Sequence, residues 1–105
     1  MPRLYPLYSS SKGNSTFVGT TSAGILIDCG VSCKRIKQAL ASNSIPLSAV
    51  KAIFITHEHS DHIKGLHMFT RDNDVPVYAL PQTLDILYDK SLIMSRAVEI
   101  NGAAD

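Results

Sequence analysis

The sequence predicts an α/β fold in which helices pack on a β-sheet. Segments with strand patterns alternate along the chain with segments whose apolar residues recur at helical spacing. Residues 50–55 form a short, nearly continuous apolar run, which is typical of a strand buried on both faces. With 105 residues, 45% of them apolar and 18% charged, the chain has the composition of one globular domain at most.

The N-terminal part is expected to form strands joined by polar turns. Residues 4–8 are the first expected strand, and the polar run 9–15 is expected to be a turn because its glycine and asparagine tolerate positive φ. Residues 16–19 and 24–28 surround a short polar segment, which predicts a hairpin. Asp28 ends the last of these strands and is followed by a cysteine and a glycine.

A helix is expected to begin after Ser32, whose side chain is a good N-cap, and to end near Ala41. Its apolar positions fall on one face at helical spacing: Cys33, Ile36, Ala39 and Leu40. The outward positions are Lys34, Arg35, Lys37 and Gln38. We interpret this basic cluster as a solvated face rather than a nucleic-acid patch.

The second half of the chain continues the alternation. The apolar run 50–55 leads directly into a cluster of histidines, and a helix over residues 63–71 is expected to follow it. Residues 75–79 are another short strand, which Pro76 places at an edge of the sheet or at the start of the strand. Pro81 suits the first turn of a further helix.

Charge and cysteine content set broad limits on function. The formal net charge of +1 gives no electrostatic indication of nucleic-acid binding. No apolar run approaches the roughly 18 residues of a membrane span, and the first residues lack the apolar core of a secretory signal. The two cysteines, Cys29 and Cys33, are expected to stay reduced. We therefore expect a cytoplasmic protein without a membrane partner.

The chemistry is expected in one short segment that follows the apolar run. His57, His59, Asp61 and His62 bring three imidazoles and a carboxylate into one short window, and these are the usual ligands of zinc, manganese and iron. In an extended segment, residues two apart point the same way, so His57 and His59 can bind one ion. Asp61 and His62 can reach a second ion, and a water shared by the two ions would be a nucleophile at neutral pH.

Two neighbouring residues are not expected to be ligands. Glu58 would point away from the histidines beside it in an extended segment, and a zincin H-E-x-x-H motif would need a histidine at the position of Asp61. His67 is interpreted as part of a helix face. The prediction of a metal site therefore depends on the four clustered residues.

The motif HEHSDH after a hydrophobic strand resembles the signature of the metallo-β-lactamase superfamily. The stretches SSSKGNSTFV, ILIDCG, ITHEHSDHIKGL and VPVYA are similar to its YycJ/WalJ (VicX) branch of bacterial metallohydrolases, over residues 4–80. Ser10 departs from the branch, whose loop often has glycine there. The resemblance implies that His57 and His59 bind one metal, and that Asp61 and His62 bind the other.

The resemblance also assigns further roles. Asp61 would orient the attacking water and so act in catalysis. Asp28 would support the metal site from outside the ligand set, although a strand-end aspartate that forms a turn explains its position equally well. Ser11 and Asn14 would lie in a loop on the substrate side.

The implied fold is an αββα sandwich made of two similar halves, of which residues 1–105 would be the N-terminal half. The family's later ligands, two histidines and a bridging aspartate, do not follow His67 in the family's context. We therefore expect the chain alone to be inactive. The missing C-terminal half, or a homodimer partner, would cover the open face of its sheet.

The implied function is that of a metal-dependent hydrolase, a phosphodiesterase or DNA exonuclease with two divalent metal ions, zinc or manganese. The motif does not separate this from a thioester or lactam hydrolase, because one site of this kind serves many substrates. A non-catalytic half-domain that binds metal or a partner protein is the alternative outside enzymes.

Overall fold

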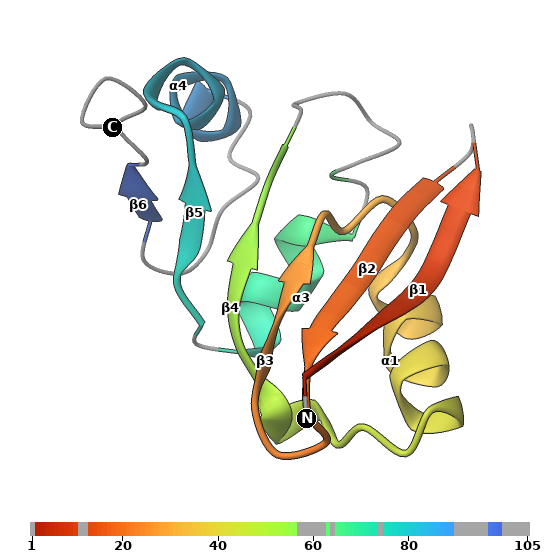
Figure 1. Ribbon diagram of the computed structural model, residues 1–105. Helices are drawn as coiled ribbons and strands as arrows, with labels where there is room; N and C mark the ends of the chain where they lie inside the picture. The colour runs from red at the N-terminus through yellow and green to blue at the C-terminus, as the bar shows by residue number, and fades with distance from the viewer. Residues whose placement is uncertain are drawn as a thin grey trace.

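The computed structural model describes residues 2–10, 13–56, 63, 65–73, 75–89 and 97–99, and strands and helices alternate along them (Figure 1). The strands are β1 (Arg3–Ser10), β2 (Gly13–Gly19), β3 (Gly24–Ile27), β4 (Val50–Phe54), β5 (Val77–Ala79) and β6 (Ala97–Glu99). The helices are α1 (Cys33–Ser42), the short 3-10 helix η1 (Leu47–Ala49), α3 (Leu66–Asp72) and α4 (Pro81–Asp89). The predicted α/β class is confirmed.

The described strands form one mixed sheet in which spatial order follows chain order, from β1 to β6. β1 and β2 pair antiparallel, as do β2 and β3, whereas β3, β4, β5 and β6 are parallel. The parallel strands end at the same edge, which lies at the top in Figure 1. Segments that leave β3 and β4 therefore begin side by side, and such edges are where open α/β sheets bind ligands.

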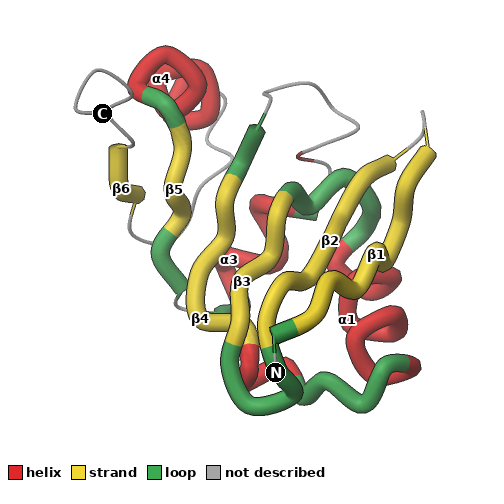
Figure 2. Tube along the Cα trace, viewed as in Figure 1, coloured by secondary structure: helices red, strands yellow, loops and turns green. Residues whose placement is uncertain are grey.

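The core lies between the sheet and the helices on one of its faces. α1 and α3 lie behind the sheet in the view of Figure 2. Phe17, Leu26 and Ile53 are neighbours across β2, β3 and β4, and all three are fully buried. Ile36 of α1 and Phe69 of α3 belong to the same apolar cluster. Full burial of a side chain of this kind contributes roughly 1.5–3 kcal/mol.

The opposite face of the sheet is also apolar but less buried. Ile25 pairs with Val18, and Ile27 pairs with Phe54, at positions that alternate with the core residues. These four side chains are half-buried. Phe54 also stacks on Tyr78 of β5, with ring centroids 4.8 Å apart and an interplanar angle of 12°. Two apolar faces are typical of a sheet inside a layered fold.

Helix α1 begins and ends as its sequence predicts. The Ser32 side chain accepts a hydrogen bond from the Arg35 backbone N–H at 3.3 Å, which confirms the N-cap. Ser44 has a φ of 59° after the last turn, and the Ile45 N–H then bonds the Leu40 carbonyl at 2.9 Å. This turn returns Ile45 to the core, where it is 2% exposed.

The turn expected over residues 9–15 is mostly wrong. Ser9 pairs with Asn14, and Ser10 pairs with Gly13, so β1 and β2 continue almost to the end of the hairpin. Backbone pairing between the strands outweighs the turn preference of these polar side chains. The extension matters because it brings the first residues of β2 to the edge where β3 ends.

The position of β5 within the sheet could not be predicted from the sequence. β5 lies between β4 and β6, so it is not an edge strand. Pro76 directly precedes β5, so the alternative prediction, that the proline stands at the start of the strand, is confirmed. The Pro76 carbonyl accepts a hydrogen bond from the Ile53 N–H at 3.0 Å. β6 was not predicted. No helix among the described residues is long and apolar enough to cross a membrane.

Candidate functional site

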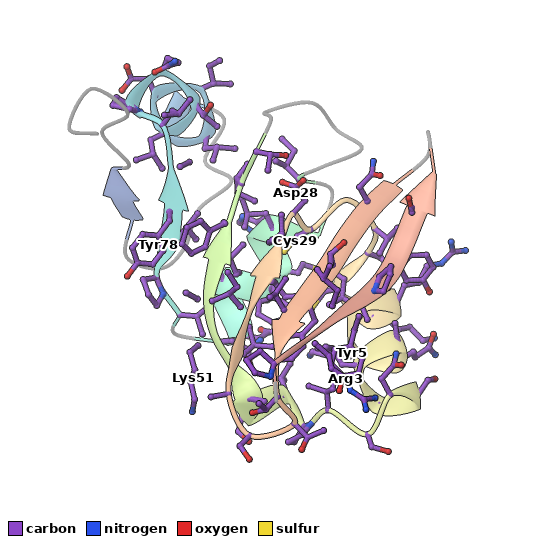
Figure 3. The ribbon with its side chains drawn as sticks, in the orientation of Figure 1. Arg3, Tyr5, Asp28, Cys29, Lys51 and Tyr78 are labelled. Atoms are coloured by element: carbon purple, nitrogen blue, oxygen red, sulfur yellow. The ribbon has the colours of Figure 1, made fainter. Side chains whose placement is uncertain are left out.

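Asp28 is the first residue beyond β3 and turns the chain away from the sheet. Its φ of 66° is in the left-handed region, which aspartate adopts more readily than most residues. Its N–H donates to the carbonyl of Phe54 at 2.8 Å, so it is attached to the end of β4. The residue is 5% exposed, and Figure 3 shows it at the upper end of the sheet.

The Asp28 carboxylate bonds the residue that directly precedes the histidine motif. One carboxylate oxygen accepts the Thr56 backbone N–H at 2.8 Å, and the other accepts the Thr56 hydroxyl at 2.6 Å. Hydrogen bonds to an ionised acceptor are shorter and stronger than neutral ones. The end of β3 therefore fixes Thr56, the last described residue before His57.

The loop that begins at Asp28 is also held by the first residues of β2. The buried Ser15 hydroxyl donates to the Asp28 carbonyl at 2.8 Å. The Gly30 N–H donates to the carbonyl of Asn14 at 2.7 Å. The structure thus brings the predicted site residues Asn14 and Asp28 to the same edge of the sheet. Ser11 lies outside the described residues.

The same loop contacts the chain beyond the motif. The Gly65 N–H donates to the Cys29 carbonyl at 2.7 Å, directly before α3 begins at Leu66. Sequence reasoning gave Thr56, Ser15 and Gly65 no role of their own. The available signal was that all three lie within the stretches SSSKGNSTFV and ITHEHSDHIKGL, which carry the family resemblance.

The two cysteines belong to the apolar core. Both are free thiols and are buried. Burial, and then the charge of Asp28, raise the pKa of the Cys29 thiol far above its ordinary value. Burial is also the main cause that raises the pKa of Cys33. Because a thiol attacks as the thiolate, the raised pKa values disfavour a role as nucleophile for either group.

The predicted metal ligands His57, His59, Asp61 and His62 lie outside the described residues, and their roles stay predictions. Within the described ranges, which omit that segment, no group of three or more His, Cys, Asp or Glu is placed to hold a metal ion. The donor set of the motif itself, imidazole and carboxylate, suits a divalent metal. The structure contributes the position of Thr56, the residue that directly precedes His57 in the chain.

Comparison with known proteins identifies the family. Residues 10–100 match the family model of the metallo-beta-lactamase superfamily. The chain is 43% identical over 77 residues to the exodeoxyribonuclease YycJ of Bacillus anthracis, and 40% identical over 77 residues to the exodeoxyribonuclease WalJ of Streptococcus pneumoniae. Each match covers 73% of this chain and 29% of the relative, so the chain spans under a third of their length.

Solved structures agree on the fold. A B3 metallo-beta-lactamase with an active-site glutamic acid superposes with a TM-score of 0.77 at 18% identity, over 93% of this chain and 42% of that one. The predicted metallo-β-lactamase fold is confirmed, whereas the assignment of residues 1–105 to its N-terminal half stays a prediction. The chain belongs to the metallo-beta-lactamase superfamily.

Proposed function

We propose that the protein carrying this chain is a metal-dependent hydrolase of phosphodiester bonds in DNA. The observation that carries the proposal is that the buried Asp28 carboxylate accepts two hydrogen bonds from Thr56 at the carboxyl edge of the sheet. Thr56 directly precedes the HEHSDH segment in the chain. A buried carboxylate that fixes the start of a ligand-rich segment is the support that a metal site needs.

The ligand set supports two divalent metal ions, zinc or manganese. We assign His57 and His59 to one ion, and Asp61 and His62 to the other. Bound metal would supply charge stabilisation at the reacting phosphate and lower the pKa of a bound water. Asp61 is the residue that we expect to orient that water.

The remaining residues of the edge orient the site. Asp28 holds Thr56, and through it the first ligand residue, without being a ligand itself. Asn14 lies at the start of β2, beside the loop that follows Asp28, and Ser11 precedes it in the chain. We expect both to face the substrate.

The similarity to known proteins favours DNA over a lactam or thioester as substrate. The relatives at 43% and 40% identity are named exodeoxyribonucleases, whereas the superposed lactamase shares 18% identity and so supports the fold alone. Substrate classes diverge on one fold, so sequence identity is the better guide here.

The proposal is tested with the complete protein that carries this chain, on end-labelled DNA with zinc or manganese. We expect metal-dependent release of nucleotides, and a loss of roughly 10²-fold or more in Asp61→Asn. Asp85→Asn is the matched control, because Asp85 is an exposed residue of α4. Cleavage of a lactam or thioester in place of DNA would contradict the substrate assignment, and full activity of Asp61→Asn would contradict the site.

We further propose that the half-buried face of the sheet is covered by the rest of the complete protein, as in an αββα sandwich. Ile27 and Phe54 lie on this face. In the complete protein, Ile27→Ser should lower the free energy of unfolding by roughly 2 kcal/mol or more, because it places a hydroxyl in an apolar layer. A change below about 0.5 kcal/mol, the usual effect at an open surface, would contradict coverage of the face.

A further inference from the structure

We propose that the loop Asp28–Cys29–Gly30–Val31 clamps both ends of the segment that carries the metal motif, and that Gly65 is a positioning residue of this clamp. The expected effect on metal affinity rests on the proposed function. The clamp itself rests only on the contacts at residues 56 and 65.

The first contact of the clamp precedes the motif. The Asp28 carboxylate bonds the Thr56 N–H and hydroxyl at 2.8 and 2.6 Å. This contact is made by a side chain.

The second contact follows the motif and is made by the backbone. The Gly65 N–H donates to the Cys29 carbonyl at 2.7 Å. A Cβ on Gly65 would lie 2.2 Å from the Val31 carbonyl oxygen and 3.1 Å from the Cys33 backbone nitrogen. Both are backbone atoms, which move only if the loop or the start of α1 moves.

The requirement for glycine at position 65 is one of space and not of backbone conformation. Its φ is −94°, which any residue adopts. Only the missing side chain lets the chain approach the Val31 carbonyl this closely. An alanine would therefore push the loop and residue 65 apart without otherwise straining the start of α3.

The loop itself has little freedom to yield. Its carbonyl at Asp28 accepts the Ser15 hydroxyl at 2.8 Å, and its Gly30 N–H donates to the Asn14 carbonyl at 2.7 Å. The Asp28 N–H is bonded to the Phe54 carbonyl at 2.8 Å. Because β2 and β4 hold the loop, the displacement caused by a side chain at Gly65 falls on the motif side.

The expected consequence is a loss of metal affinity that exceeds the loss of stability. Partners that orient metal ligands from outside the ligand set typically change affinity by roughly 10- to 100-fold when altered. We expect a loss in this range for Gly65→Ala in the complete protein, measured by zinc titration. We also expect an altered visible absorption spectrum when cobalt replaces zinc.

Gly24→Ala is the matched control. A Cβ on Gly24 would lie 2.5 Å from the Val18 carbonyl oxygen and 2.5 Å from the Phe17 ring, so it is as crowded as Gly65, but it lies at the other end of β3. We expect it to lower the melting temperature with zinc affinity and the cobalt spectrum unchanged. Equal loss of affinity in both variants, or no loss in Gly65→Ala, would overturn the proposal.

A second measurement needs no metal, and it does not depend on whether Gly65→Ala folds. Since one loop holds both contacts, Thr56→Val should raise the hydrogen-exchange rate of the Gly65 amide along with that of residue 56. An unchanged rate at Gly65 would overturn the clamp. If the wild-type protein binds no metal while this coupling is observed, the proposed function fails and the clamp stands.

Discussion

The hydroxyl of Thr56 should contribute measurably to the stability of the protein, although the residue is exposed. Thr56→Val removes the hydroxyl that donates to the Asp28 carboxylate at 2.6 Å and keeps the shape of the side chain. Thr56→Ser keeps the hydroxyl and removes only a methyl group. The two variants therefore separate the hydrogen bond from packing.

The magnitude follows from the charge and burial of the acceptor. A hydrogen bond to a charged group contributes about 1.5–3 kcal/mol. Asp28 is 5% exposed, so water has limited access to its carboxylate, whereas Thr56 is exposed and lets some water reach the vacated position. We therefore expect a loss of about 2 kcal/mol for Thr56→Val and below about 0.5 kcal/mol for Thr56→Ser.

The assay is equilibrium urea unfolding of the complete protein, followed by far-ultraviolet circular dichroism, with metal chelated to exclude ligand effects. The wild type and both variants should unfold with equal denaturant dependence and differ in midpoint. Equal stability of the valine variant and the wild type would refute the reasoning. So would a serine variant as unstable as the valine variant, since packing would then explain the loss.

Four further outcomes are expected. Ser15→Ala should lower the free energy of unfolding by about 1 kcal/mol, because the Asp28 carbonyl loses its buried donor at 2.8 Å; a gain in stability in denaturant titrations would contradict this. Phe17→Ala should cost about 3–5 kcal/mol in the same titrations, because the ring is fully buried, and a loss below about 1 kcal/mol would show that it is not a core residue. Cys29 and Cys33 should react with a thiol reagent at pH 8 only after unfolding, and labelling of the native protein at the unfolded rate would refute their burial. Since their pKa values are raised in the fold, their contribution to stability should be fully present below the ordinary value of 9.0 and decline as pH rises above it.

The sequence was sufficient for most of the fold because its local signals are strong. The run 50–55 contains β4, the Ser32 cap starts α1, and Pro81 starts α4, as predicted. These features depend on short-range patterns of apolar, capping and turn residues. The order of strands and the position of β5 inside the sheet depend on pairing between distant segments, which no local pattern encodes.

The candidate site divides in the same way. Residue types and spacing were enough to propose the metal ligands, and Asp28 was proposed by resemblance. What Asp28 does at this position is accept two hydrogen bonds from Thr56. These bonds join residues that follow different strands, so only the structure could show them. The role of Gly65 could not be predicted from the sequence for the same reason. The close approach that leaves no space for a side chain at position 65 is made by the backbone of Val31, a residue distant in the chain.

The most direct test of the metal site is calorimetric titration of zinc and manganese into the complete, metal-free protein, with the double variant His57→Ala/His59→Ala as control. The wild type should bind metal tightly and gain about 2.7 kcal/mol of stability when free metal is 100 times the dissociation constant. The double variant should lose both effects. Equal binding by the wild type and the double variant would contradict the assignment of these histidines as ligands and, with it, the proposed metal-dependent hydrolase.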